Sequence, residues 1–256
     1  MSITSTVKSV GYSILESLTA KKGIKRMING SSVRFPARWS RYYEADYESD
    51  NYGYLKRTAK PGMHLIDIGA HLGLFSTVSS QLVGPSGKIV CFEPTPGTFA
   101  ILKETLRMNG CANVTAVQGA VSSSVGTATF YVSQTAGCNA NSLVKGGMGA
   151  AAEGYEVKLY TIDSVTAEHA LQPAIIKIDA EGAEYDVLRG GVTTFRQFRP
   201  KLILGLHPAF IKEKGDTLEG IWELLAGCGY QVEMEGRMIG RDEFCSQTLL
   251  FDVHCI

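Results

Sequence analysis

The stretch Leu65-Ile-Asp-Ile-Gly-Ala-His-Leu-Gly73 decides the fold of this chain, together with Cys91-Phe-Glu-Pro94 further along. The apolar residues of the first stretch predict a buried parallel strand, and its glycines predict a turn that lets the backbone approach a ligand. A second predicted strand, 88–92, ends at Glu93, whose two carboxylate oxygens suit the vicinal diol of a ribose. We therefore expect a nucleoside site between these two strand ends.

The turn between Gly69 and Gly73 distinguishes two adenosine cofactors. It lacks the central glycine of the dinucleotide fingerprint, because Ala70 and His71 stand there. Asp67, just before the turn, would repel a pyrophosphate but could receive a cationic ligand. S-adenosylmethionine carries an ammonium and a sulfonium group, so the sequence favours it over NAD. An NAD-linked oxidoreductase and a non-catalytic cofactor-binding scaffold of the same fold are the alternatives.

From residue 61 onward, predicted strands alternate with predicted helices, which is typical of a Rossmann-like, doubly wound α/β fold. We expect a mostly parallel seven-stranded sheet with an antiparallel last strand. The expected organisation is an N-terminal helical and aromatic extension over 1–58, followed by one α/β domain over 59–256. The expected strands are 63–68, 88–92, 114–121, 126–133, 157–162, 174–179, 201–206, 230–234 and 248–255, and the expected helices are 72–83, 96–109, 182–190 and 217–227.

Two segments of the chain suggest roles outside the sheet. Residues 1–28 have apolar residues at helical spacing followed by lysines and an arginine, which predicts a basic amphipathic helix. It would pack on the domain or on a second subunit, and contact with a membrane surface is the alternative. Residues 134–154 are rich in Gly, Ala and Asn and too long for a simple connection, so they are a candidate substrate lid.

Composition narrows the class of partner. Lys plus Arg and Asp plus Glu are both 25, so the net charge is zero, and we expect no general attraction to nucleic acid or anionic membranes. No apolar run is long enough for a transmembrane segment, and no cleavable signal pattern is recognisable. The six cysteines show no C-x-x-C spacing, which favours reduced thiols, a cytoplasmic location and no zinc site.

Charged residues follow four of the predicted strands. Asp67, Glu93, Asp179 and His207 all stand at or near carboxyl ends, where ligands bind in an open α/β sheet. We expect them to meet in one crevice. Either Asp179 or His207 could take a proton from a methyl acceptor.

The densest group of charges is Lys177-Ile-Asp-Ala-Glu-Gly-Ala-Glu184. Strand alternation would point Lys177, Asp179 and Glu181 the same way. Glu181 joins Asp179 as a catalytic candidate, although acids near a helix N-terminus are also favoured by the helix dipole, and this applies equally to Glu184. Oxygen ligands suit magnesium, so Asp179 and Glu181 are candidate metal ligands as well.

Three motifs of this sequence resemble those of the FkbM family of S-adenosylmethionine-dependent methyltransferases: residues 65–76, residues 92–94, and residues 177–184 with 187–190. The resemblance covers roughly residues 45–256. The third motif, 177–190, is the specific one, whereas the first two occur across class I methyltransferases. The resemblance implies O-methylation of a hydroxyl on a sugar, polyketide or other small molecule or glycan, and the zero net charge predicts no nucleic acid as partner. It also implies that Asp67, Gly69 and Glu93 hold the cofactor. The full set of candidate cofactor contacts is Asp67, Gly69, His71, Gly73, Glu93, Pro94, Gly119 and Ala120.

Two positions depart from the family pattern. His71 stands where the family usually has Asn, which could alter contact with the methionine part of the cofactor. Gly205 stands where a Glu often precedes the His two residues later, which weakens the expectation of an acid–histidine pair there. The sequence names neither the acceptor nor the oligomeric state, although the N-terminal extension could support a homo-oligomer.

Overall fold

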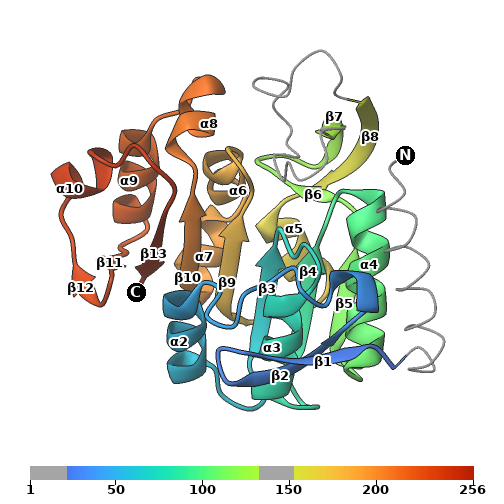
Figure 1. Cartoon of the computed structure of the whole chain (residues 1–256). Helices are drawn as coiled ribbons and strands as arrows, with labels where there is room; N and C mark the ends of the chain where they lie inside the picture. The colour runs from blue at the N-terminus through green and yellow to red at the C-terminus, as the bar shows by residue number, and fades with distance from the viewer. Residues whose placement is uncertain (1–21, 133–152) are drawn as a thin grey trace.

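The structure is a computed structural model that describes residues 22–132 and 153–256. A mixed sheet forms its centre (Figure 1). Within these residues the sheet has eight strands in the order β12-β11-β13-β10-β9-β3-β4-β5. Five neighbouring strands are parallel, and β13 is antiparallel to β10 and β11. The strands are β3 (His64–Ile68), β4 (Lys88–Phe92), β5 (Val114–Val117), β9 (Pro173–Asp179), β10 (Lys201–Leu206), β11 (Val232–Met234), β12 (Arg237–Met238) and β13 (Phe251–Cys255).

This arrangement confirms the expected doubly wound sheet with an antiparallel last strand, and the two-residue β12 adds an eighth strand at the edge. The chain order runs outward from β3 through β4 to β5, and then returns to the other side of β3 with β9 and β10. The order therefore reverses between β3 and β9. Open α/β sheets bind their ligands outside the carboxyl ends of the strands at such a point.

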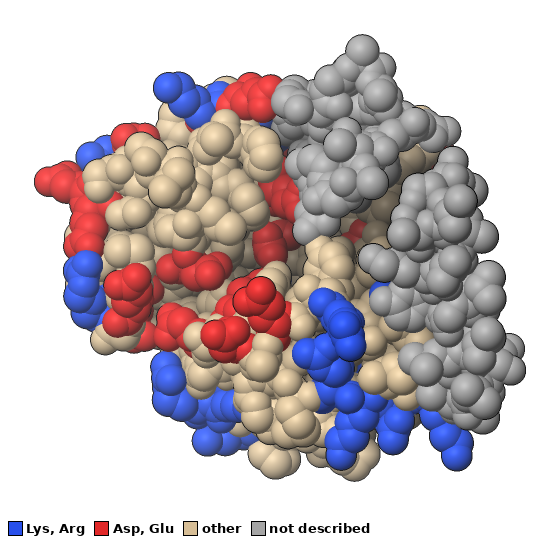
Figure 2. Space-filling model, viewed as in Figure 1, with Lys and Arg blue, Asp and Glu red and all other residues tan. Residues whose placement is uncertain are grey.

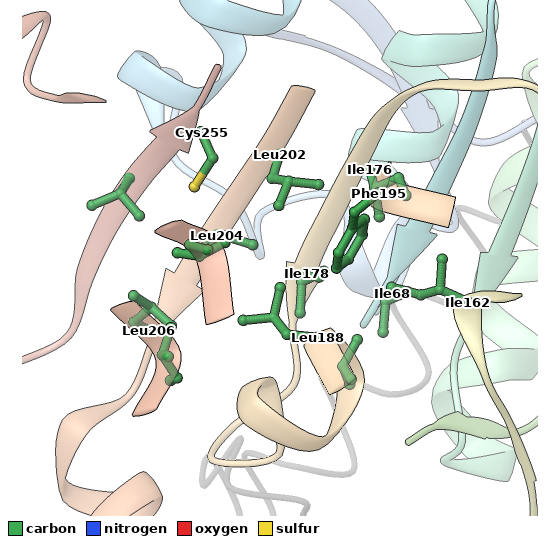
Figure 3. Close-up of a cluster of buried hydrophobic side chains, with 14 of the residues drawn as sticks. Ile68, Ile162, Ile176, Ile178, Leu188, Phe195, Leu202, Leu204, Leu206 and Cys255 are labelled. Atoms are coloured by element: carbon green, nitrogen blue, oxygen red, sulfur yellow. The ribbon is translucent and has the colours of Figure 1, made fainter. Parts of the chain in front are cut away.

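One face of the sheet is covered by α5 (Ile162–Glu168), α6 (Glu184–Arg189), α7 (Val192–Phe198) and α9 (Leu218–Gly227). Every second residue of the central strands points into this layer, as the period of a strand requires. Figure 3 shows Ile68, Ile178 and Leu204 from three neighbouring strands beside Leu188 and Phe195 of the helices. Burial on both faces explains why these strands are continuous apolar runs.

The opposite face is covered by α2 (Ser49–Thr58), α3 (Leu74–Val83) and a hairpin of β1 (Ile24–Ile28) and β2 (Ser31–Phe35). The intervening residues Leu65, Ile175 and Ile203 point into this layer. Nearer the carboxyl ends of β3 and β9, the next positions on this face are the charged residues Asp67, Lys177 and Asp179. This alternation gives the charged residues of the sheet a common side.

The hairpin corrects the expectation of a helix through residue 28, because 24–28 form a strand. The turn is Asn29-Gly30, with φ values of 47° and 70°, which are the left-handed values that two-residue hairpin turns require. Asn-Gly is the strongest short hairpin signal in a sequence, and it outweighs the apolar spacing before it. The rest of the predicted N-terminal helix, residues 1–21, lies outside the described residues.

The predicted strand at 114–121 is divided in the structure. Only β5 joins the main sheet, whereas β6 (Ala120–Val121) pairs with β8 (Glu153–Tyr160) in a small sheet of order β6-β8-β7, with β7 at Gly126–Val132. This small sheet lies beyond the carboxyl ends of β3 and β4 (Figure 1). The candidate lid at 134–154 falls almost entirely outside the described residues.

The remaining elements include helices that the sequence did not predict. Helix α7 begins directly after Gly191, just beyond the predicted end of a helix at residue 190. The short α8 (Pro208–Glu213) follows β10, and α10 (Arg241–Cys245) precedes β13. Helix α4 (Pro96–Met108) agrees closely with the prediction.

Although the net charge of the chain is zero, acidic and basic residues are unevenly distributed over the surface. On the face in Figure 2, acidic residues form a band across the middle and basic residues lie below it. Across the described ranges, no helix combines the length and hydrophobicity that crossing a membrane requires.

Candidate cofactor and active site

The turn after β3 approaches β9 so closely that only glycine fits at position 69. Gly69 has φ +81°, and a Cβ there would lie 1.9 Å from the backbone oxygen of Asp179. The turn is tied to β4, because Gly69 N and Ala70 N both donate to Phe92 O. Gly73, with φ +86°, is the N-cap residue of α3. The predicted glycines thus bring the ends of β3, β4 and β9 together.

Asp67 is fully buried, with 0% of its surface exposed. The Ser76 hydroxyl, in the first turn of α3, donates to Asp67 Oδ2 at 2.5 Å. The other oxygen, Oδ1, is buried without a hydrogen-bond partner among the described residues. Burial raises the pKa of Asp67, while Lys177 and Ser76 oppose this rise. A buried carboxylate oxygen without a protein partner suits a cationic group of a ligand.

Glu93 lies directly after β4 and is 6% exposed. Its two oxygens accept hydrogen bonds from His71 N at 3.1 Å and Thr95 N at 2.9 Å, so the carboxylate joins the two motifs of the predicted nucleoside site. Burial raises the pKa of Glu93 to about 7, against the hydrogen bonds that it accepts. The Thr95 side chain donates to Glu93 as well, so at least one of the carboxylate's lone pairs stays open to a ribose hydroxyl.

His71 adopts a left-handed conformation, with φ 48°. Its Nδ1 lies 2.8 Å from the hydroxyl of Tyr43, and its ring lies against Tyr42, with ring centroids 4.9 Å apart. Burial, with a further contribution from Lys177, lowers the pKa of His71 to about 4. The aromatic segment before α2 therefore covers the glycine turn, and His71 is neutral there at physiological pH.

The other predicted cofactor contacts lie at the small sheet. Ala120 belongs to β6, and a Cβ on the preceding Gly119 would lie 2.7 Å from the ring of Tyr160. The backbone oxygen of Pro94 accepts a hydrogen bond from the Tyr155 hydroxyl at 3.1 Å. Packing against β8 thus accounts for Gly119, and a role for Gly119, Ala120 and Pro94 toward a cofactor stays a prediction.

Asp179 ends β9 and pairs with a buried lysine of the same strand. Lys177 Nζ lies 3.0 Å from Asp179 Oδ2. Burial alone would raise the pKa of Asp179, but the charges of Lys177 and then His207 lower it overall. Lys177 is only 6% exposed, and although burial disfavours its charge, the carboxylates of Asp179, Glu48 and Asp67 raise its pKa.

His207, directly after β10, lies between two carboxylates. Its Nδ1 is 2.8 Å from Glu184 Oε1, and its Nε2 is 3.9 Å from Asp179 Oδ1. Glu184 is fully buried and also accepts from Gly182 N with both oxygens. Because an ionised carboxylate can only accept, His207 Nδ1 carries the proton and Nε2 is left as an acceptor. Burial lowers the pKa of His207, but the hydrogen bond and charge of Glu184, together with the charges of Asp179 and Glu181, outweigh this effect, so the pKa is raised.

An acid–histidine pair is therefore present although Gly205 lacks the expected carboxylate. Glu184 supplies the acid from the start of α6, after β9, whereas the position that the family pattern indicates lies in the next strand, β10. Gly205 instead lies between Asp179 and Asp252 in the sheet register, with no side chain separating them. Burial raises the pKa of Asp252 to about 6.

Glu181 has a left-handed backbone, with φ 45°, at the turn after β9. Burial, followed by the charge of Asp179, raises its pKa to about 8. In the described part of the chain, no three His, Cys, Asp or Glu side chains group as ligands of one metal ion. The Asp179 carboxylate is paired with an ammonium group, so we assign neither Asp179 nor Glu181 as a metal ligand.

The structure thus brings the predicted residues into two adjoining groups, with Asp67, His71 and Glu93 in one and Asp179, Glu181 and His207 in the other. Four important partners were not among the predicted site residues. Lys177 shares strand alternation with Asp179, and Glu184 belongs to the same sequence motif, so both had a signal. Tyr43 belongs to the aromatic stretch 35–56, which the sequence marks as a possible cover of the cofactor pocket, and Ser76 ends the first motif. Their exact contacts had no signal, because they depend on how separate segments pack.

The sequence of this chain is similar to those of known methyltransferases. The family model described as "Methyltransferase FkbM domain" matches residues 67–232. The methyltransferase sdnD of Sordaria araneosa is 29% identical over 154 residues, which are 49% of this chain and 59% of that protein. The match thus spans about three fifths of the length of this curated relative.

Two solved structures are similar to this chain at low sequence identity. A methyltransferase FkbM from Methylobacillus flagellatus KT has 14% identity and a TM-score of 0.48, covering 80% of this chain and 50% of that one. Fibrillarin from Aeropyrum pernix, solved with bound S-adenosyl-L-methionine, has 13% identity and a TM-score of 0.48, covering 91% of this chain and 82% of that one.

The family match covers well over half of the chain and includes the β3 turn, the β4 end and the Lys177–Glu184 motif. It decides between the two cofactors that the sequence left open, in favour of S-adenosylmethionine. The buried Asp67 oxygen and the Gly69 turn fit that cofactor independently. This chain belongs to the FkbM family of S-adenosylmethionine-dependent methyltransferases.

Proposed function

We propose that this protein is an O-methyltransferase that acts on a hydroxyl group of a small molecule or glycan. The observation that carries this proposal is the His207–Glu184 pair at the carboxyl end of the sheet. The pair leaves His207 Nε2 as a proton acceptor, 3.9 Å from Asp179.

A proton acceptor favours a hydroxyl over an amine as the methylated group. A neutral amine attacks a methyl group with its own lone pair and can lose its proton afterwards. A hydroxyl oxygen becomes a good nucleophile only as its proton leaves, so a positioned base accelerates the reaction. A histidine with a pKa above its ordinary value is suited to this task near neutral pH.

The cofactor supplies an electrophilic methyl group on a sulfonium. On the protein side, we propose that Glu93 accepts hydrogen bonds from the ribose and that Asp67 Oδ1 receives the α-ammonium. Gly69 and Gly73 allow the β3 turn to come close to the ligand, and His71 lies at the same turn. Methyl transfer requires in-line placement of the acceptor oxygen, which is chiefly a matter of positioning.

On the acceptor side, we propose that His207 Nε2 takes the hydroxyl proton as the oxygen forms its bond to the methyl carbon and the carbon–sulfur bond breaks. Asp179 stabilises the resulting imidazolium. His207 is a better candidate for the base than Asp179, because Lys177 already compensates the Asp179 charge. Magnesium is left out of this proposal. Glu181 as a catalytic group, the cytoplasmic location and a homo-oligomer stay predictions.

The proposal is tested by methyl transfer from S-adenosylmethionine with an isotopically labelled methyl group to a panel of glycosides and phenols. We expect label in a methyl ether and release of S-adenosylhomocysteine. His207→Asn should bind S-adenosylhomocysteine normally and lose about 10²–10⁴-fold in kcat, the usual contribution of a general base.

His64→Asn is the matched control, since His64 lies at the amino end of β3, where Gln172 N donates to its Nδ1. It should keep full turnover. Label found only on nitrogen, or full activity in His207→Asn, would refute the proposed O-methylation by this base.

A further inference from the structure

Lys177 has no role in the proposed chemistry, yet it is the most enclosed cation of the site. It is 6% exposed, lies in the middle of the main sheet and points to the face of α2 and α3, with its Nζ 5.8 Å from the centre of the Phe75 ring. Burying an ammonium group is costly unless it is paired. Its position therefore needs an explanation from the groups around it.

Two carboxylates of the site lie on either side of this lysine. Lys177 Nζ forms an ion pair with Asp179 Oδ2 at 3.0 Å. In the sheet register, Lys177 is the direct neighbour of Asp67 on the parallel strand β3, so their side chains lie on the same face. The ammonium group of Lys177 thus lies between Asp67, which is proposed to bind the cofactor, and Asp179, which lies beside the proposed base.

Asp179 is in turn shared between two positive partners. Its Oδ2 contacts Lys177, whereas its Oδ1 faces His207 Nε2 at 3.9 Å. Lys177 and the imidazolium of His207 therefore compete for the charge of the same carboxylate. If Lys177 were uncharged, Asp179 would hold a proton on His207 more strongly.

We propose that Lys177 is a positioning residue that connects the two sides of the site: it fixes Asp179 beside the base His207, limits the attraction of Asp179 for the imidazolium, and compensates the charge of Asp67. The inference rests on the proposed function, because it gives His207 the role of the base. Lys177 touches neither reacting atom, and it acts through its neighbours.

Several charged or titratable groups share this environment and enter any pH dependence. They come from β3, β9 and β13, from the segments that follow β3, β9 and β10, from the start of α6, and from the segment before α2. They are Asp67, His71, Asp179, Glu181, Glu184, His207, Asp252, Tyr47 and Glu48. A pH profile of turnover would mix their contributions. The test therefore follows individual residues.

The experiment is an NMR titration of His207 in the full chain saturated with S-adenosylhomocysteine, with ¹⁵N-labelled histidine and His207→Asn for assignment. In Lys177→Met, the midpoint of His207 should rise by about one pH unit, a tenfold gain in proton affinity. Lys177→Arg restores the charge and should return the midpoint toward that of the wild type. Lys201→Met, on the neighbouring strand β10 at its amino end, should leave the midpoint unchanged.

A midpoint of His207 that is the same in Lys177→Met and in the wild type overturns the proposal, since a merely structural lysine would not move it. If Lys177→Met does not fold, ¹³C carboxyl signals of the wild type decide instead. Asp179, assigned with Asp179→Asn, should titrate below the ordinary aspartate value of 3.8, and a midpoint at or above that value also overturns it.

The proposed function and the role of Lys177 are contradicted by different results. Wild-type protein that does not bind S-adenosylhomocysteine at all contradicts the proposed function. Normal binding together with an unmoved His207 midpoint contradicts only the role of Lys177.

Discussion

Asp67 illustrates how single residues build this site. Its carboxylate is buried, one oxygen is held by Ser76, and the other has no hydrogen-bond partner among the described residues. Keeping such a group in a fold costs stability unless a ligand completes its hydrogen bonds. The same reasoning applies to Glu93, whose oxygens are held by backbone N–H groups and still have lone pairs to offer.

We predict that Asp67→Asn weakens S-adenosylhomocysteine binding about ten- to a hundredfold, because it removes the charge from a hydrogen bond to the ligand ammonium, worth about 1.5–3 kcal/mol. Ser76→Ala, which removes only the internal partner of Oδ2, should weaken binding much less. Isothermal titration calorimetry of the three proteins makes the comparison. Equal losses in both variants would mean that Asp67 only orders the turn.

The sequence located Asp67, Glu93, Asp179 and His207 because each follows or ends a strongly apolar strand, and the carboxyl ends of parallel strands meet at one edge. It could not give the partners of these residues. Glu184 reaches His207 from a different helix, and Tyr43 reaches His71 across 28 positions of the chain. Such contacts depend on tertiary packing, which local patterns do not encode.

At the scale of elements, the β3–α3 turn is the most constrained part of the described fold. Gly69 combines a left-handed backbone with an approach to Asp179 that leaves no room for a Cβ. Gly84, at the C-cap of α3, has φ +65° but open space around it. Replacing Gly84 by alanine therefore measures the cost of the backbone conformation alone, whereas replacing Gly69 adds the cost of a steric clash.

We predict that Gly84→Ala lowers the free energy of unfolding by about 1–3 kcal/mol, because φ 65° with ψ −175° is a backbone conformation that is essentially restricted to glycine. Gly69→Ala should cost more than about 3 kcal/mol, because the strand ends must also move apart. Urea denaturation measures both. Similar losses in the two variants would show that the approach of β3 and β9 can relax easily.

Elements inside the sheet were the easiest to predict. Strands 88–92 and 201–206 agree with β4 and β10 to the residue, because each is a short apolar run between turn signals. The division of 114–121 was not predictable from hydrophobicity, since β5 and β6 are both apolar and differ only in the sheet that they join. The hairpin of β1 and β2 has a signal in Asn29-Gly30, whereas the apolar spacing before it predicts a helix.

At the scale of the whole molecule, residues 22–58 and the α/β domain share one hydrophobic cluster. Phe35 of β2 and Tyr52 of α2 are buried in the same layer as Leu65 and Ile175 of the sheet. The boundary near residue 58 is therefore a boundary in composition, because residues on both sides of it belong to the same hydrophobic core. We propose that the described residues fold as one cooperative unit.

Phe35→Ala should accordingly destabilise the whole protein by about 3–5 kcal/mol, as expected for removing a buried ring. Met27→Ala on the same hairpin should change stability by less than about 0.5 kcal/mol, since Met27 is 53% exposed. Thermal unfolding followed by both near-UV and far-UV circular dichroism should give one transition. A separate early transition in Phe35→Ala would mean that the hairpin and α2 unfold independently of the α/β domain.

The most direct test of the account is the affinity of S-adenosylhomocysteine for the wild type and for Glu93→Ala. Calorimetry at about pH 8 keeps Glu93 ionised, since its pKa is about 7. Affinity for the wild type should fall as the pH drops through that value, because the protonated carboxyl accepts fewer hydrogen bonds. We predict that Glu93→Ala binds about ten- to a hundredfold more weakly and loses this pH dependence. Unchanged affinity in Glu93→Ala would contradict the placement of the nucleoside between the ends of β3 and β4.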